Sequence, residues 1–145
     1  MTRRVLLLGW GAGLLRADAA QQVYDLFADM AAALSAANPQ AFLADVDKAL
    51  PGYEKLAADV TGLLREYLAE SSVELNKNEG DDRTRKVEAD WLLTLRPVGA
   101  GTFLKPEALA TVTREKALEC TVSKQGRKWK ITALEPADFF APPAE

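Results

Sequence analysis

Apolar residues recur at helical spacing over the first half of the chain. Between residues 20 and 37 they fall three or four positions apart, which places them on one face of a helix. Asn38-Pro39 is typical of a helix start, because Asn caps the first turn and Pro fits the first helical position. Pro51-Gly52 then interrupts the pattern before a further amphipathic stretch. We therefore predict helices near 20–37, 39–49 and 53–69.

After residue 70 the period of the pattern changes to two. Apolar and polar residues alternate over 72–77, 85–96, 112–123 and 128–134, which predicts four strands. Because the alternation is clean, one face of the sheet is buried and the other is solvated, which is typical of antiparallel sheets. The residues predicted to point inward are Val73, Leu75, Val87, Ala89, Trp91, Leu93, Leu95, Leu118, Cys120, Val122, Trp129, Ile131 and Ala133. After Pro136 the chain is expected to leave as an extended tail.

Three helices followed by such a sheet predict an α+β domain. We expect the three N-terminal helices to pack in the concave face of a curved antiparallel sheet of about four main strands, which wraps the third helix. The element order, the helix break Ala49-Leu50-Pro51-Gly52-Tyr53 and the strand Lys128-Trp129-Lys130-Ile131 resemble the nuclear transport factor 2-like superfamily, also called SnoaL-like or cystatin-like cone folds. The resemblance covers about 20–142. It implies the fold alone, since that superfamily holds isomerases, cyclases, dehydratases, transport adaptors and domains without known activity.

The N-terminal residues have the pattern of an export signal. Arg3-Arg4 precedes an uncharged, mostly apolar stretch over 5–15, and Ala17-Asp18-Ala19 supplies small residues for cleavage. As a helix the apolar stretch would rise only about 16 Å, against about 30 Å of bilayer core, so it is too short to span a membrane. We predict a signal peptide over 1–19, a single domain over 20–145, and a mature protein in the periplasm or outside the cell.

Two other interpretations of this N-terminal stretch exist. Gly9-Trp10-Gly11 begins like the glycine-rich turn of a dinucleotide-binding domain, but Leu14 stands where the third glycine is needed, and no alternating strands and helices follow. A buried N-terminal strand is the other alternative. Thr2-Arg3-Arg4-Val5-Leu6-Leu7 favours export, because it resembles a twin-arginine motif.

The composition removes several kinds of chemistry. The sequence holds no histidine, which excludes Ser-His-Asp and Cys-His catalysis and histidine-ligated metals. Cys120 is the one cysteine, so it forms no internal disulfide, and we expect it to be a small buried hydrophobe. Removal of 1–19 takes away three arginines and one aspartate, so the net charge moves from −3 to −5. This acidity argues against nucleic acid as a partner. We expect no metal and no cofactor.

None of the residues predicted to point inward is a carboxylate, whereas enzymes of the superfamily keep an acid or base inside the cone. We therefore expect a non-catalytic exported binding module for a small apolar ligand or an envelope protein partner. A homodimer through the outer face of the sheet is a variant of this role. The alternative is a small isomerase or lyase that uses a carboxylate or Tyr in the cone. The outward acids are expected to pair across strands with Lys116, Lys128 or Lys130.

The connection over 97–110 is longer than a hairpin needs, and such loops are uncommon unless they are functional or disordered. It holds two adjacent apolar residues, which we expect to gate a pocket lined by aromatic side chains or to meet a partner. The alternative is that they plug the open end of the cone. The predicted ligand-binding residues are Tyr53, Tyr67, Trp91, Phe103, Leu104 and Trp129.

Overall fold

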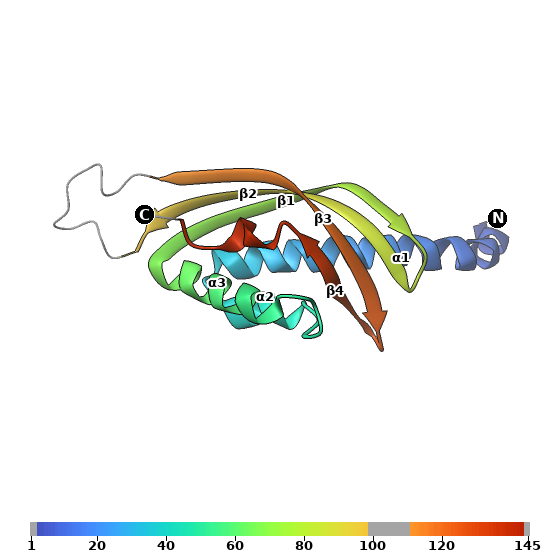
Figure 1. Ribbon diagram of the computed structural model, residues 1–145. Coiled ribbons are helices and arrows are strands. Elements are labelled where there is room, and N and C mark those ends of the chain that lie inside the picture. The colour runs from blue at the N-terminus through green and yellow to red at the C-terminus, as the bar shows by residue number, and fades with distance from the viewer. Residues whose placement is uncertain (1–2, 99–110, 144–145) are drawn as a thin grey trace.

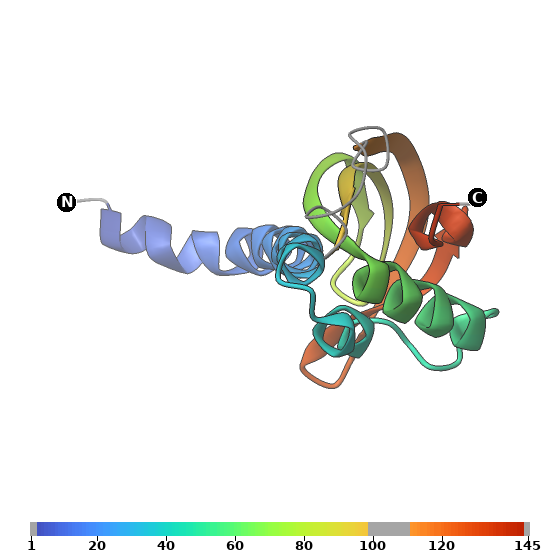
Figure 2. The same cartoon turned by 90° about the vertical axis from the view of Figure 1, so that its left-hand side faces the viewer.

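Three helices precede the sheet: α1 (Arg3–Ser35), α2 (Pro39–Ala44) and α3 (Tyr53–Glu66). The computed structural model describes residues 3–98 and 111–143, with side chains described from Ala19 onward. The N-terminal part of α1 projects beyond the sheet, and the rest of this helix lies beneath it (Figures 1 and 2). No helix within the described residues combines the length and the apolar character needed to cross a bilayer.

Local capping starts α2 where the sequence predicts, and a tertiary contact ends it early. The Asn38 side chain accepts a hydrogen bond from the Ala41 N–H at 3.0 Å. Beyond Ala44 the backbone joins the edge of the sheet. The Ile131 N–H donates to the Asp45 carbonyl, and the Asp47 N–H donates to the Ile131 carbonyl, both at 2.9 Å. The predicted helix over 39–49 was therefore too long.

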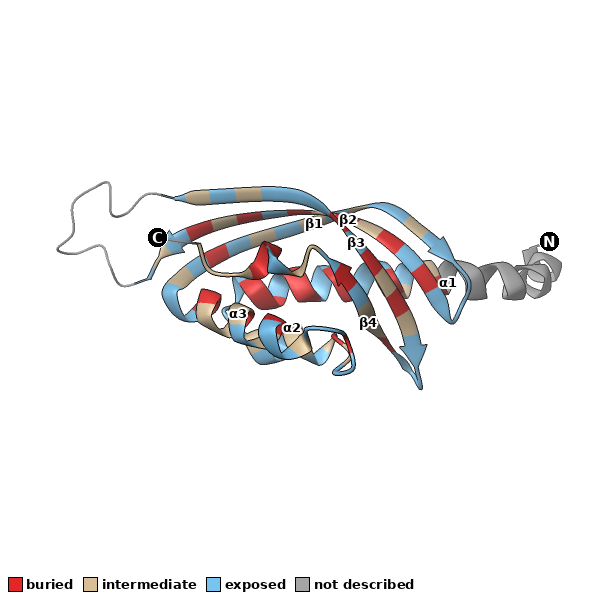
Figure 3. Ribbon diagram, in the orientation of Figure 1, coloured by how far each residue is buried: buried red, intermediate tan, exposed pale blue. Residues whose placement is uncertain are grey.

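Four antiparallel strands follow, and each pairs with the next along the chain: β1 (Tyr67–Gly80), β2 (Thr84–Pro97), β3 (Val112–Gln125) and β4 (Lys128–Glu135). Figure 1 shows the sheet curved over the helices, which lie on its concave side. Figure 3 shows buried residues alternating with more exposed ones along the strands. The predicted α+β class, with three helices in the concave face of a four-stranded antiparallel sheet, is confirmed.

The sheet packs mainly on α1, so the prediction that it wraps the third helix was wrong. Helix α1 runs along β1 and is hydrogen-bonded to it at two distant points. The Ser71 N–H donates to the Ser35 hydroxyl, and the Asn78 side chain donates to the Ala20 carbonyl, each at 3.0 Å. Helix α3 ends at Glu66 and contacts β1 over a shorter length.

One residue on β4 points the other way from the prediction. Ala133 is exposed and Leu134 is buried. The cause is a register shift between β3 and β4: Val122 pairs with Ile131 and Thr121 pairs with Ala133, so β4 holds one extra residue. Such a bulge reverses the faces of every residue beyond it.

The chain after β4 is part of the core, which corrects the expectation of an extended tail. Residues Ala137–Phe140 form a short 3-10 helix, η2, that buries Phe139 and Phe140. The Arg114 guanidinium donates to the Phe139 carbonyl at 2.6 Å and so ties this turn to β3. Burial of these two rings is favourable, because it removes their apolar surface from water.

Candidate functional site

Four aromatic rings fill the concave side of the sheet. Trp91 on β2 is completely buried. Its ring centroid lies 6.0 Å from Phe27 on α1, 6.3 Å from Phe42 on α2 and 5.1 Å from Phe140 on η2. The Trp91 indole N–H donates to the Ser71 hydroxyl at 2.7 Å, so its polar atom is satisfied. We call the space between the concave face of the sheet and the helices the cone. Side chains from the sheet and from the helices therefore occupy its centre.

The structure places the four described residues of the predicted ligand-binding set on four different elements: Tyr53 on α3, Tyr67 on β1, Trp91 on β2 and Trp129 on β4. Tyr53 begins α3 and Tyr67 follows its last residue, so they lie about 20 Å apart at a rise of 1.5 Å per residue. Trp91 lies in the aromatic cluster. Trp129 is buried at β4, where its indole N–H donates to the Gln22 side chain at 2.9 Å. The remaining two residues of the prediction, Phe103 and Leu104, lie outside the described residues.

Charge is scarce in the described interior. Arg85 is the one buried charged residue in this part of the chain, at 7% exposure. Its guanidinium donates to the Asn78 side chain at 2.8 Å, to the Asn78 carbonyl at 2.7 Å and to the Asp81 carbonyl at 3.0 Å. These bonds hold the β1–β2 hairpin together. Among the described residues, no carboxylate is buried in the cone to act as an acid or base.

A polar hollow of about 230 Å³ opens beside the cone, between α1 and the β3–β4 turn. It is lined by Gln22, Asp25, Leu26, Asp29, Asp45, Arg127, Lys128 and Trp129. Burial raises the pKa of the half-buried Asp45, and the Asp29 charge adds to this, whereas Lys128 and Lys130 oppose it. Sequence reasoning missed Asp45, because the pattern placed it inside a predicted helix.

The outer face of the sheet carries most of the acidic strand residues. The strand register sets Glu88, Glu119 and Glu135 side by side on three neighbouring strands. Around them lies a hollow of about 300 Å³ that also includes Lys77 and Lys86 in its wall. The described residues hold one side-chain ion pair, and it lies on α3, between Lys55 and Asp59 at 2.8 Å.

The acids on this face do not find the basic partners that the sequence suggested. Lys130 donates to the Ala44 carbonyl at 2.8 Å. Lys116 is in register with Trp91, an inward residue, so it leaves the sheet on the helix side. The expected cross-strand pairs with these lysines were therefore wrong. The sequence alone could not predict which residues lie opposite one another, because this depends on the register of three pairs of strands.

Cys120 fits the prediction of a small buried hydrophobe. Its side chain is buried on β3, and among the described residues it has no cysteine for a disulfide. Burial, together with the neighbouring Glu119 charge, raises the pKa of the Cys120 thiol to about 12. Since the thiolate is the nucleophile, a thiol with this pKa is almost entirely protonated at neutral pH and is expected to be a poor nucleophile.

No protein-family model and no curated protein matches the chain. Solved structures do match it. A conserved protein from Planctomyces limnophilus is 10% identical, with a TM-score of 0.66 over 79% of this chain and 91% of the other. A type 2 hexachlorocyclohexane dehydrochlorinase is 14% identical, with a TM-score of 0.64 over 84% of this chain and 86% of the other.

A protein of the nuclear transport factor 2-like superfamily from Salmonella enterica serovar Typhimurium is also similar. It is 12% identical to this chain, with a TM-score of 0.61 over 81% of this chain and 89% of the other. At such identities the likeness concerns the arrangement of helices and strands and not the chemistry of a site. Taken with the helices packed in the concave face of the curved sheet, it shows that the chain has the nuclear transport factor 2-like fold.

Proposed function

We propose that the protein is a non-catalytic binding module that meets another envelope protein through the outer face of its sheet. The packing around Trp91 carries this proposal. Four buried rings occupy the cone, where relatives with an enzymatic site would need a cavity and an acid or base. The filled cone favours a protein partner over a small apolar ligand, while the outer face remains free among the described residues.

The proposed module is exported, with a signal over 1–19 and a mature chain that begins at Ala20. Two observations support this. The N-terminal part of α1 projects away from the sheet (Figure 2). The hydrogen bond from Asn78 to α1 reaches the carbonyl of Ala20, so it survives cleavage before this residue. N-terminal sequencing of protein recovered from the periplasm or medium tests it, and an intact Met1 on cytoplasmic protein would contradict it.

A small isomerase or lyase is the second candidate, and Asp45 is the observation that favours it. Its carboxyl lies in the hollow beside the cone with a raised pKa, which suits a general base. Asp25 and Asp29 line the same hollow. This candidate requires a substrate that enters between α1 and β4, and loss of a measured turnover in D45N would establish it over the binding role.

Site-specific photo-crosslinking tests the binding role with a matched pair of alanines. Ala117 lies opposite Asp90 on the outer face, and Ala58 lies on α3; both are exposed. A photoreactive residue at either position leaves the core intact. We expect a discrete crosslinked species from position 117 in the cells that make the protein and none from position 58. Equal products at both positions, or none at 117, would rule out an outer-face partner.

A further inference from the structure

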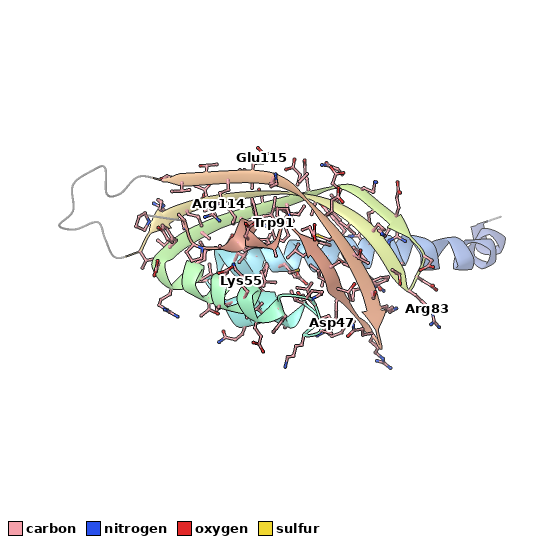
Figure 4. The ribbon with its side chains drawn as sticks, in the orientation of Figure 1. Asp47, Lys55, Arg83, Trp91, Arg114 and Glu115 are labelled. Atoms are coloured by element: carbon pink, nitrogen blue, oxygen red, sulfur yellow. The ribbon has the colours of Figure 1, made fainter. Side chains whose placement is uncertain are left out.

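An exposed leucine lies in the middle of the outer face of the sheet. Leu92 on β2 is 37% exposed, and the strand register places Ser72 of β1 on one side and Glu115 of β3 on the other. Directly opposite residues in antiparallel strands lie about 5 Å apart at Cα. Figure 4 shows Glu115 on the outer side of the sheet and Trp91 on the side of the helices.

Carboxylates surround this leucine. Besides Glu115, they are Glu70 and Glu74 on β1 and Asp90 on β2, each about 7–8 Å from Leu92 as a diagonal or next same-face neighbour. We call Leu92 and these four acids the acidic leucine patch. Two hollows of about 310 and 190 Å³ adjoin Leu92, and their walls include all four acids.

Nothing in the described part of the chain neutralises the patch. Its four carboxylates form no side-chain hydrogen bond or ion pair there. Glu74 and Asp90 are direct cross-strand partners, an arrangement of like charges that destabilises a sheet by itself. Residues that lie opposite one another on neighbouring strands form a row across the sheet. The nearest basic side chains on the outer face lie in other rows than these acids: Arg96 pairs with Leu68, and Lys77 pairs with Glu88.

We propose that the acidic leucine patch is the docking surface for an arginine- or lysine-bearing segment of the partner protein. The inference rests on the outer-face binding role proposed above and names the chemistry of the partner. The aliphatic stem of an Arg or Lys packs on Leu92, and its head group reaches the carboxylates on either side. The charge complementarity relieves the Glu74–Asp90 repulsion that the free protein carries.

The same charges argue against a second copy of this chain as the occupant. In a two-fold dimer centred on the patch, the patch would face its own copy. This arrangement brings carboxylates against carboxylates. The homodimer considered from the sequence is therefore replaced by a basic partner in this proposal.

The test uses the full chain and two peptides, hexa-arginine and hexa-glutamate, at low and moderate salt. Two triple variants change the net charge equally: E74Q/D90N/E115Q in the patch and E88Q/E119Q/E135Q in the neighbouring row. We expect the wild type to bind hexa-arginine only, and the patch variant to bind it about tenfold more weakly, because charge-assisted contacts are lost. The neighbouring-row variant should weaken binding by less than about threefold.

A second matched pair tests the leucine. Leu92 and Leu68 are both exposed on the same face, so L92S and L68S remove similar apolar groups. Only L92S should weaken hexa-arginine binding. We expect a loss of about threefold, because the peptide would bury only part of the Leu92 side chain. Thermal melting confirms that each variant folds, and the patch variant should melt no lower than the wild type, since it removes like-charge repulsion.

Several outcomes would overturn the proposal. Equal weakening by the two triple variants would mean non-specific attraction to net charge. Absence of hexa-arginine binding would exclude a basic partner at this patch. A dimer in sedimentation that L92S dissociates would show a second copy to be the occupant. Crosslinks at position 117 without patch-dependent peptide binding would contradict the proposal of a basic partner. They would still support a partner on the outer face.

Discussion

Phe140 lies edge-on against Trp91, with ring centroids 5.1 Å apart and ring planes at 87°. Trp91 belongs to β2 and Phe140 to η2, so the contact joins the sheet to the last element of the described chain. The contact closes the cone, because Phe140 also packs 5.1 Å from Phe42 on α2. The C-terminal turn therefore fills part of the space between the sheet and the helices.

Substitution of Phe140 tests whether this turn is part of the core. F140A should lower the free energy of unfolding by about 3–5 kcal/mol, as loss of a buried aromatic ring does. Urea denaturation of the full chain measures this. Y24A is the control, since Tyr24 is 46% exposed and should change stability by less than about 0.5 kcal/mol. Equal effects of the two variants would mean that η2 is not packed in solution.

Arg85 should matter more than any exposed arginine. R85A removes three hydrogen bonds and leaves the Asn78 and Asp81 acceptors without their donor, so we expect a loss of about 2–4 kcal/mol. R83A, at the exposed neighbouring turn, should change stability by less than about 0.5 kcal/mol. Chemical denaturation of both variants makes the comparison, and equal midpoints would contradict the role of Arg85 in the hairpin.

Asp45 predicts a pH dependence of stability. Its pKa is raised in the folded state, so the folded protein holds this proton more tightly than the unfolded chain. As pH rises from the usual value of 3.8 through the raised pKa, the wild type loses stability relative to D45N, which cannot ionise there. Melting temperatures of both proteins between pH 3 and 7 measure the difference. A constant difference over this range would contradict the prediction.

Cys120 should resist thiol reagents as long as the protein is folded. With its pKa raised from 9.0 to about 12, the folded thiol holds roughly a thousandfold less thiolate than the unfolded chain at pH 8. Labelling with Ellman's reagent should therefore be slow in buffer and fast in denaturant, with C120S as the blank. Rapid labelling of the folded protein would show that β3 opens around this residue.

Local signals in the sequence determined the elements whose causes are themselves local. Asn38 caps α2 by accepting a hydrogen bond from the backbone N–H three residues on, so the dipeptide Asn38-Pro39 was enough to predict where this helix begins. The strict alternation over 85–96 assigns the faces of β2, because a strand with one buried side must keep its period of two. The α+β order of the whole chain follows from the same two periods.

Tertiary structure decided the features that depend on partners distant in sequence. Helix α2 ends where the backbone after Ala44 pairs with Ile131, and Ala133 turns outward because β3 and β4 shift register. The burial of Phe140 needs Trp91, and the acidic leucine patch needs three strands in register around Leu92. Periodicity along a chain describes neighbours within one element. It holds no information on which residue of another element will lie opposite, because that depends on how the packed layers share the same core.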